Sequence, residues 1–220
     1  MKLSTLLGIL LSFLIGWGML NPAYAQAATP ALASTTSATD APEISPSVAK
    51  ATFAGGCFWC MEHPFDQLGG VLSTTSGYTG GDYANPSYSE VSSGMTGHLE
   101  SVKISYDPAQ VSYEQLLSVF WHNIDPLDER GQFCDKGSQY RSAVFYHDEQ
   151  QQQLAEVTKQ DVAEQFDHPV ATEILPAQEF YAAEDYHQNY YQTHPVRYRV
   201  YRFGCGRDQR LTKLWGNPHE

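Results

Sequence analysis

One six-residue stretch constrains this chain more than any other: Gly55-Gly56-Cys57-Phe58-Trp59-Cys60. The apolar residues just before it predict a short strand at 50–54, and residues 61–68 predict a helix. Cys57 therefore lies where a strand passes into a helix, near the positive end of the helix dipole, which favours a thiolate. A thiolate at an accessible turn is a nucleophile, and the thiol of Cys60 can capture what Cys57 becomes. The stretch predicts redox or covalent sulfur chemistry.

Pro64 falls inside this predicted helix. Its ring clashes with the carbonyl four residues back, that of Cys60, and it donates no N–H. We therefore expect either an irregular turn between Cys57 and Cys60 or a regular helix that begins only near Met61.

Residues 1–25 resemble a secretory signal peptide, with Lys2, an apolar run from Leu6 and a cleavage pattern at Ala23-Tyr24-Ala25. The alternative is an uncleaved membrane anchor, which the short, glycine-interrupted run disfavours. Residues 26–48 are rich in Ala, Ser, Thr and Pro, which predicts a flexible linker. We expect export, most simply to a bacterial periplasm, and no stable insertion into a membrane after cleavage.

The net charge of −12 disfavours a nucleic-acid partner, because phosphate binding needs a basic face. The locally basic segment 197–213 is interpreted as a solvated tail. The folded part, residues 49–216, is long enough for one core, and we expect a monomer.

Four cysteines lie at positions 57, 60, 134 and 205. In an exported protein, four cysteines allow two disulfides in three connectivities. The core is large enough not to need them for stability. A zinc site would want four ligands, and there is only one Cys-x-x-Cys pair, so no metal and no other cofactor is predicted.

The rest of the pattern predicts a single α/β domain of the α+β kind. Strands are expected near 50–54, 71–77, 100–106, 142–146 and 172–175, and helices at 61–68, from Ser112, at 148–166 and at 182–191. Long loops are expected at 78–96 and 125–139, with a loop-rich C-terminal tail. This order predicts a two-layer sandwich with helices packed on one mixed sheet, a ferredoxin-like plait.

Five further motifs follow the first in the chain: Gly77-Tyr78-Thr79-Gly80-Gly81, Asn85-Pro86-Ser87-Tyr88, Thr96-Gly97-His98-Leu99-Glu100, Gly137-Ser138-Gln139-Tyr140-Arg141-Ser142 and Glu184-Asp185-Tyr186-His187-Gln188. In this order and spacing the chain resembles the A-type peptide methionine sulfoxide reductases over about residues 49–216. The resemblance implies the family's α/β fold and reduction of the S epimer of methionine sulfoxide, free or in proteins. It also implies an active site lined by the residues that match the family's: Cys57, Phe58, Trp59, Tyr88, Glu100, Asp135 and Tyr140.

The chemistry can also be argued from the residues. A sulfoxide sulfur is electrophilic, and its oxygen leaves only when protonated. Cys57 is the candidate nucleophile, and Glu100 is the candidate acid, provided that burial keeps its proton in place at neutral pH.

Four aromatic residues complete the candidate site. Tyr88 and Tyr140 can donate hydrogen bonds to the oxygen as charge develops on it. Phe58 and Trp59 can form an apolar pocket for the methyl group.

Attack by Cys57 leaves a sulfenic acid, which a second thiol condenses to a disulfide. Cys60 is the first choice, since on one helical turn the two Cα atoms should lie about 5–6 Å apart, within the range of a disulfide. Cys205, on a glycine-flanked and mobile tail, can take part in a relay that Cys134 could join. A thioredoxin-like dithiol would complete the cycle by exchange.

Two other functions stay open at this point. The first is a thiol–disulfide oxidoreductase that uses Cys57-Phe58-Trp59-Cys60 directly on proteins. The second is an exported binding module stapled by the pairs Cys57–Cys60 and Cys134–Cys205.

Overall fold

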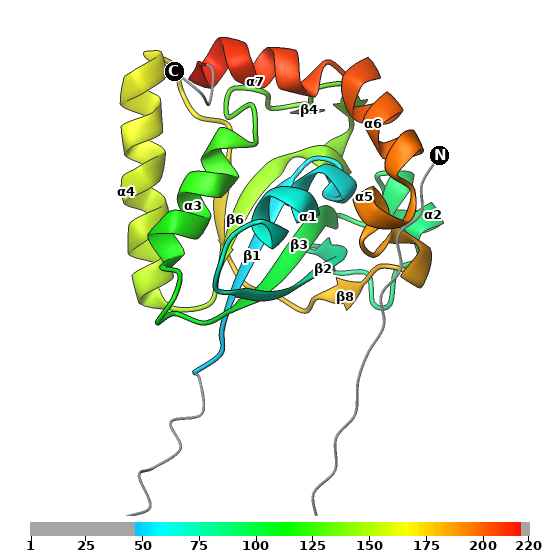
Figure 1. Ribbon diagram of the computed structural model, residues 1–220, viewed down its shortest axis with the longest axis horizontal. Helices are drawn as coiled ribbons and strands as arrows, with labels where there is room; N and C mark the ends of the chain where they lie inside the picture. The colour runs from blue at the N-terminus through cyan, green and yellow to red at the C-terminus, as the bar shows by residue number, and fades with distance from the viewer. Residues whose placement is uncertain (1–46, 217–220) are drawn as a thin grey trace, which may run out of the picture. The chain divides into compact units, whose positions relative to one another are not determined.

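The computed structural model describes residues 47–216, so the predicted signal peptide (1–25) and nearly all of the predicted linker (26–48) lie outside the described residues. The elements of the described part are, in order, β1 (Ala49–Gly55), α1 (Phe58–Asp66), β2 (Val71–Thr79), α2 (Tyr88–Ser92), β3 (Leu99–Tyr106), α3 (Tyr113–His122), β4 (Gly131–Gln132), β5 (Asp135–Lys136), the 3₁₀ turn η1 (Ser138–Tyr140), β6 (Ser142–Tyr146), α4 (Glu149–Phe166), β7 (Glu173–Pro176), β8 (Tyr181–Ala182), the 3₁₀ turn η2 (Asp185–His187), α5 (Tyr190–Thr193), α6 (Pro195–Gly204) and α7 (Arg207–Trp215) (Figure 1).

A six-stranded sheet in the order β7-β6-β1-β3-β2-β8 organises the fold. The β6–β7 pair is parallel and the other neighbours are antiparallel. In Figure 1, α1 lies in front of the central strands, with α3 beside it and α4 on the far side of α3. The predicted mixed sheet with packed helices is confirmed.

The main core lies between the sheet and these helices. On β1, Ala51 and Phe53 face the helices, and Ala54 faces a smaller cluster on the other side of the sheet. The alternation predicted for β3 is present, and its apolar positions are buried. The ring of Phe53 stacks on three others, with centroid distances of 5.4 Å to Phe65, 6.0 Å to Tyr113 and 5.0 Å to Phe120.

Replacing Phe53 with alanine is expected to lower the free energy of unfolding by about 3–5 kcal/mol, because it opens a cavity among stacked rings. Phe203 is the matched control, since it is 77% exposed, and its replacement by alanine should change stability by less than about 0.5 kcal/mol. Denaturant unfolding of both variants measures the difference. Equal losses would show that this ring cluster does not form the core.

Local helix signals were read correctly from the sequence. Ser112 caps α3 and forms the predicted capping box with Gln115. The side chain of Asp148 caps α4, which ends at Phe166 as predicted.

The predicted loop at 78–96 and the predicted helix at 182–191 are both partly wrong. Strand β2 runs on to Thr79, and the capping box of Ser87 starts the short helix α2 inside the loop. Residues 182–191 hold the end of β8, the turn η2 and the start of α5, because β8 pairs with the edge of β2. Asn189, with a φ of 50°, then adopts the left-handed backbone conformation, which separates η2 from α5.

Helix α1 begins at Phe58 and contains Pro64, so the prediction that regular helix begins only near Met61 is wrong. Cys57 is its N-cap residue. The N–H of Cys60 donates to the carbonyl of Cys57 at 3.0 Å, a bond across three residues that makes the first turn tighter than an α-turn.

The C-terminal tail is helical rather than loop-rich. Pro195 starts α6, and α7 follows after Gly206. Arg207 fixes α7 in place: it is 1% exposed, and its Nη2 donates to the carbonyls of Gly55 at 3.1 Å and Asn123 at 2.6 Å. The sequence could not reveal this burial, because an arginine in a basic run predicts a solvated side chain.

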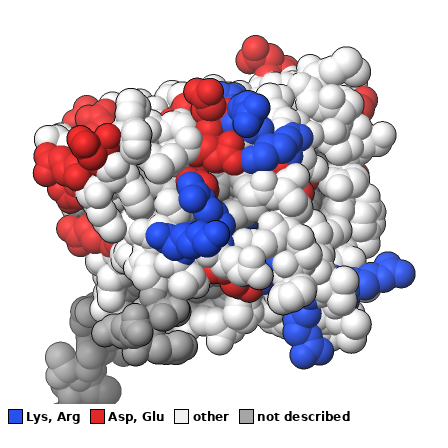
Figure 2. All heavy atoms as spheres, turned by 90° about the horizontal axis from the view of Figure 1, so that it is seen from above, with Lys and Arg blue, Asp and Glu red and all other residues white. Residues whose placement is uncertain are grey.

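The face formed by α6 and α7 carries basic and acidic side chains side by side (Figure 2). Arg202 pairs with Asp208 at 2.6 Å, and Arg210 pairs with Asp125 at 2.7 Å. The positive charge of segment 197–213 is therefore partly neutralised within the fold. Within residues 47–216, no helix has the length and apolarity that crossing a membrane requires.

Candidate active site

Cys57 lies at the junction of β1 and α1, beside a small cavity of about 70 Å³. It is 6% exposed. The cavity is lined by Cys57, Phe58, Trp59, Tyr88, Glu100, Asp135, Tyr140 and Tyr201. The structure thus brings together all seven site residues implied by the resemblance and adds Tyr201.

Two glycines allow β1 to turn into α1 at this point. Gly56 has a φ of 78°, and a Cβ on it would lie 2.5 Å from the Cβ of Gln132. A Cβ on Gly55 would lie 2.6 Å from the sulfur of Met61. Any other residue would push the nucleophile's turn away from the hairpin β4–β5 and from the core of α1.

Glu100 comes from β3 and is 2% exposed. Its Oε2 accepts the backbone N–H of Phe58 at 3.1 Å. Burial raises the pKa of Glu100 to about 8, helped by the charge of Asp135 and opposed by the Phe58 hydrogen bond. The carboxyl group therefore keeps its proton at neutral pH, which is the condition that the predicted acid requires.

The two cysteines of α1 are free thiols, and their pKa values shift in opposite directions. Burial raises the pKa of Cys57, and the hydrogen bond to Cys60 and the charge of Glu100 raise it further. In the substrate-free protein, burial thus opposes the Cys57 thiolate that the helix position was predicted to favour. The hydrogen bond from Cys57 lowers the pKa of Cys60 to about 7 despite its burial, with help from the charges of Arg207 and Arg202.

Three tyrosines line the cavity: Tyr88, Tyr140 and Tyr201. The backbone N–H of Tyr88 donates to Glu184 at 2.9 Å, which fixes the start of α2. Burial raises the pKa of Tyr88 to about 12 and raises those of Tyr140 and Tyr201 as well, so all three stay protonated donors at neutral pH. Tyr201 was missed because it lies in the segment that the sequence presented as a tail.

Phe58 and Trp59 form the apolar side of the cavity. Phe58 is buried, whereas Trp59 is half-buried and stacks on Tyr190 with a centroid distance of 3.8 Å. The indole N–H of Trp59 donates to Nδ1 of His187 at 3.0 Å. His187 lies behind the active-site aromatics, with its ring packed against Phe58, Trp59 and Tyr88.

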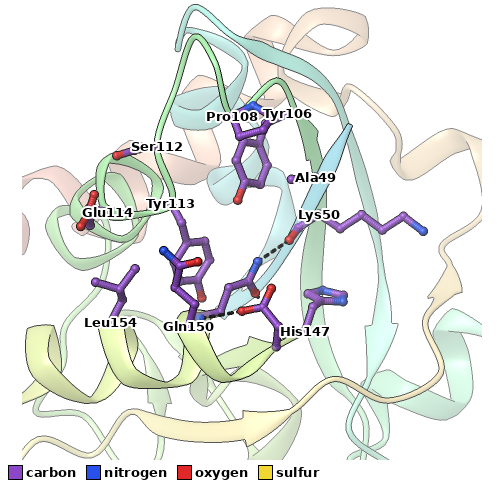
Figure 3. A pocket seen from close by; sticks show the side chains of 12 residues that line it. Ala49, Lys50, Tyr106, Pro108, Ser112, Tyr113, Glu114, His147, Gln150 and Leu154 are labelled. Atoms are coloured by element: carbon purple, nitrogen blue, oxygen red, sulfur yellow. Dashed lines mark hydrogen bonds between the residues drawn. The ribbon is translucent and has the colours of Figure 1, made fainter. Parts of the chain in front are cut away.

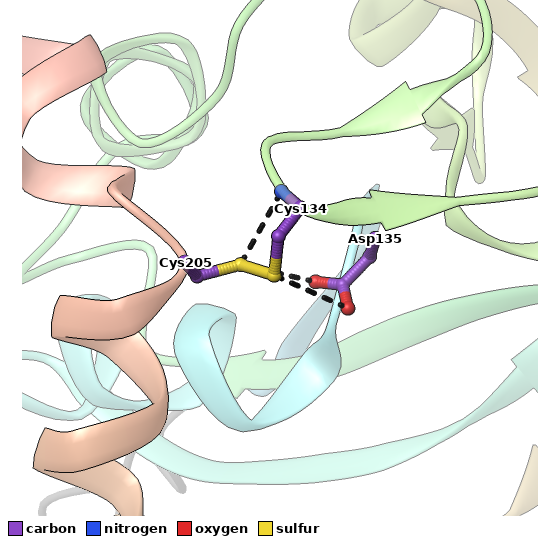
Figure 4. Close-up of side chains that lie close together, drawn as sticks. All are labelled: Cys134, Asp135 and Cys205. Atoms are coloured by element: carbon purple, nitrogen blue, oxygen red, sulfur yellow. Dashed lines mark hydrogen bonds between the residues drawn. A yellow bond between two sulfur atoms is a disulfide. The ribbon is translucent and has the colours of Figure 1, made fainter.

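Cys134 and Cys205 form a disulfide with a Cα–Cα distance of 5.0 Å (Figure 4). Cys205 lies between α6 and α7, so its predicted place on a mobile tail is wrong. The carboxylate of Asp135 lies between this disulfide and the cavity, with oxygens 3.8 Å from each sulfur. Asp135 also accepts the hydroxyl of Tyr201. The second cysteine pair is therefore next to the site of Cys57.

These three side chains are also the one group of possible metal ligands found in residues 47–216, with ligand atoms within 4.8 Å of one another. The S–S bond occupies both sulfurs and leaves no thiolate. In this oxidised state, the group does not fit a metal.

A sequence model of the family described as peptide methionine sulfoxide reductase matches residues 49–219. The chain belongs to this family. It is 52% identical over 172 residues to peptide methionine sulfoxide reductase MsrA of Bacillus licheniformis, covering 77% of this chain and 95% of the relative. The enzyme of the same name from Bacillus subtilis is 52% identical over 168 residues, covering 76% and 95%.

Solved structures of the family agree. Methionine sulfoxide reductase A of Corynebacterium diphtheriae is 35% identical, with a TM-score of 0.63 over 69% of this chain and 77% of that one. Mxr1 from Saccharomyces cerevisiae in reduced form is 31% identical, with a TM-score of 0.64 over 68% and 87%. These likenesses establish both the family and the α/β fold.

A larger cavity, of about 420 Å³, lies at the other end of β1, between the starts of α3 and α4 (Figure 3). It is about 20 Å from the family's active site, given the rise of a strand. Tyr113, His147 and Lys50 line it, but no cysteine does. Sulfur chemistry therefore belongs to the small cavity and not to the large one.

Proposed function

We propose that this chain reduces the S epimer of methionine sulfoxide, free or in proteins, to methionine. One observation carries the proposal: the thiol of Cys57 and the buried, protonated carboxyl of Glu100 line the same small cavity. Family membership supports the same reaction, and the chain is accordingly an oxidoreductase.

In the first step, the oxygen passes from the methionine sulfur to Cys57. The S–O bond of the sulfoxide breaks and one forms on Cys57, which becomes a sulfenic acid and loses two electrons to the substrate. Glu100 gives its proton to the oxygen and takes the proton of the Cys57 thiol, so a free thiolate is not needed before the substrate binds. Tyr88 and Tyr140 donate hydrogen bonds to the developing charge.

In the second step, Cys60 resolves the sulfenic acid. The charges of Arg207 and Arg202 favour the Cys60 thiolate, which attacks the Cys57 sulfur, while the sulfenic oxygen takes the proton of Cys60 and leaves as water. A disulfide between Cys57 and Cys60 results.

In the third step, thiol–disulfide exchange returns Cys57 and Cys60 to the reduced form. The pair Cys134–Cys205 lies beside Asp135 at the cavity, so in its dithiol form it can reduce the first disulfide and become the disulfide seen here. A thioredoxin-like dithiol then reduces this second disulfide.

A single incubation tests the function. Reduced protein is mixed with the S or the R epimer of methionine sulfoxide, without any recycling reductant. Methionine should appear, in an amount no greater than the reducing equivalents of the enzyme, and only from the S epimer. Reduction of insulin disulfides without any methionine would favour the thiol–disulfide oxidoreductase instead.

Cys60→Ser should still release one methionine per enzyme but lower steady-state turnover with a thioredoxin-like donor by at least about 10-fold, because resolution loses its intramolecular thiol. A single-turnover assay measures the methionine released per enzyme, and a steady-state assay measures turnover with the donor. Cys134→Ser is the comparison: it removes the relay but leaves the pair on α1 intact, so a disulfide between Cys57 and Cys60 should still form after one turnover, which mass mapping detects. Normal recycling by Cys60→Ser would assign resolution to Cys134 or Cys205.

We also propose that the mature protein begins at Gln26, is exported and is a monomer. The signal-like composition of residues 1–25 and the linker-like composition of residues 26–48 support cleavage and export, and the length of the folded part, which suffices for one core, supports the monomer. N-terminal sequencing of the protein from cell fractions tests cleavage and compartment, and light scattering tests the oligomeric state.

A further inference from the structure

His187 lies behind the cavity and has none of the roles given above. It ends η2, and its side chain is 1% exposed. Its ring centroid lies 5.0 Å from that of Phe58, 5.7 Å from that of Trp59 and 4.4 Å from that of Tyr88. One imidazole thus packs against three of the aromatic residues that line the cavity.

The hydrogen bond to Trp59 fixes the protonation of this imidazole. An indole N–H can only donate, so Nδ1 of His187, 3.0 Å away, must carry a lone pair. Burial lowers the pKa of His187, so the ring is neutral and its proton is on Nε2. Nε2 is buried and has no hydrogen-bond partner among the described residues, which costs free energy. Among the described residues, the ring therefore makes one hydrogen bond, at Nδ1, and packs against three aromatic rings.

Trp59 has two aromatic contacts besides this hydrogen bond. Its flat face stacks on Tyr190 at an interplanar angle of 7°, and its ring meets Tyr201 nearly at right angles. Such ring contacts are less directional than a hydrogen bond, because offset-stacked and edge-to-face arrangements are both favourable. The directional N–H···N bond selects one rotation.

We propose that His187 is a positioning residue: by accepting the indole N–H, it holds Trp59 at the angle at which the indole forms the wall for the methyl group of the sulfoxide. This inference rests on the proposed function. If His187 only filled space, its volume alone would matter for activity. If it positions Trp59, its ability to accept the indole hydrogen bond matters as well.

The variants His187→Asn and His187→Leu separate these two contributions. Asparagine and leucine have nearly the same shape, and both are smaller than histidine, but only the asparagine oxygen can accept the indole N–H where Nδ1 does. We expect kcat/KM for methionine S-sulfoxide to be about 10-fold lower with leucine than with asparagine, as one lost hydrogen bond implies. Most of the difference should appear in KM, because Trp59 contacts the methyl group before and during the reaction.

A double-mutant cycle tests whether the effect passes through Trp59. In a Trp59→Phe background there is no indole donor, so the leucine and asparagine variants should have equal kcat/KM. Thr158→Val is the matched control: it removes the acceptor of another indole N–H, that of Trp121 at 2.9 Å in the α3–α4 contact, and should leave kcat/KM unchanged. Equal activities of the two His187 variants, or a difference that persists with Trp59→Phe, would overturn the inference.

The wild-type protein gives a second test that does not depend on how the variants fold. Nitrogen NMR should show His187 neutral with its proton on Nε2, and the indole N–H of Trp59 should exchange slowly with solvent. A proton on Nδ1 would overturn the inference by itself. If the wild type released no methionine, the proposed function would fail, yet this measurement would still decide whether the hydrogen bond exists.

Discussion

Cys57→Ser is expected to abolish the release of methionine from methionine sulfoxide completely. The serine hydroxyl keeps its proton at neutral pH, its oxygen is a poor nucleophile towards sulfur, and it cannot enter a disulfide. The measurement is methionine released in a single turnover at high enzyme concentration, where a residual activity would be easiest to see.

Cys205→Ser is the control for this variant. It also removes one sulfur, but that sulfur belongs to the pair Cys134–Cys205, which does not attack the sulfoxide. One methionine per enzyme should therefore still appear. Thermal unfolding of both variants checks that the fold survives. Methionine release by Cys57→Ser would exclude Cys57 as the nucleophile.

Glu100→Gln should slow the reductive step by about 10²–10⁴-fold, the usual contribution of a general acid. Glutamine keeps the shape and can still accept the N–H of Phe58, but it has no proton to give to the oxygen. In the wild type, the rate should fall as pH rises through about 8, where Glu100 loses its proton. The variant should lack this decline.

The raised pKa of Glu100 also links stability to pH. The folded protein holds this proton up to about 8, whereas the unfolded chain loses it near 4.5. Between these values the native state binds more protons, so this group's contribution to the free energy of unfolding is complete below 4.5 and is lost as pH rises towards 8. Glu100→Gln should remove that part of the pH dependence.

Glu62 provides the matched control for Glu100. It is a second buried carboxyl group, on α1, and burial raises its pKa to about 7. It accepts the N–H of Asn189 at 3.3 Å and does not line the cavity. Glu62→Gln should alter stability but not the pH dependence of the reductive step. Equal rates for Glu100→Gln and the wild type would remove the acid role from Glu100.

Local patterns predicted the elements that local forces decide. The alternation of Val102 and Ile104 placed β3, and the caps Ser112 and Asp148 placed the starts of α3 and α4, because each signal acts within a few residues. The motifs then predicted which residues would meet, and seven of the eight that line the cavity were named in advance.

The features that the sequence did not reveal depend on contacts distant in the chain. The sequence of residues 182–191 predicts one helix, but in the structure the segment begins in β8, which pairs with β2. Cys57 has the helix position that favours a thiolate, but its burial, which depends on the whole fold, raises its pKa. Tyr201 reaches the cavity because α6 folds back over α1, which no motif records.

Arg207 links the last helix to the reaction. It donates to the carbonyl of Gly55, two residues before the nucleophile, and its charge favours the thiolate of Cys60. A premature stop codon just before position 207 would leave every strand and all eight cavity-lining residues encoded. The shortened product would nevertheless lose the hydrogen bond that anchors the turn of Cys57 and a cation that lowers the pKa of Cys60, so the codon of Arg207 matters to the active site as the cysteine codons do.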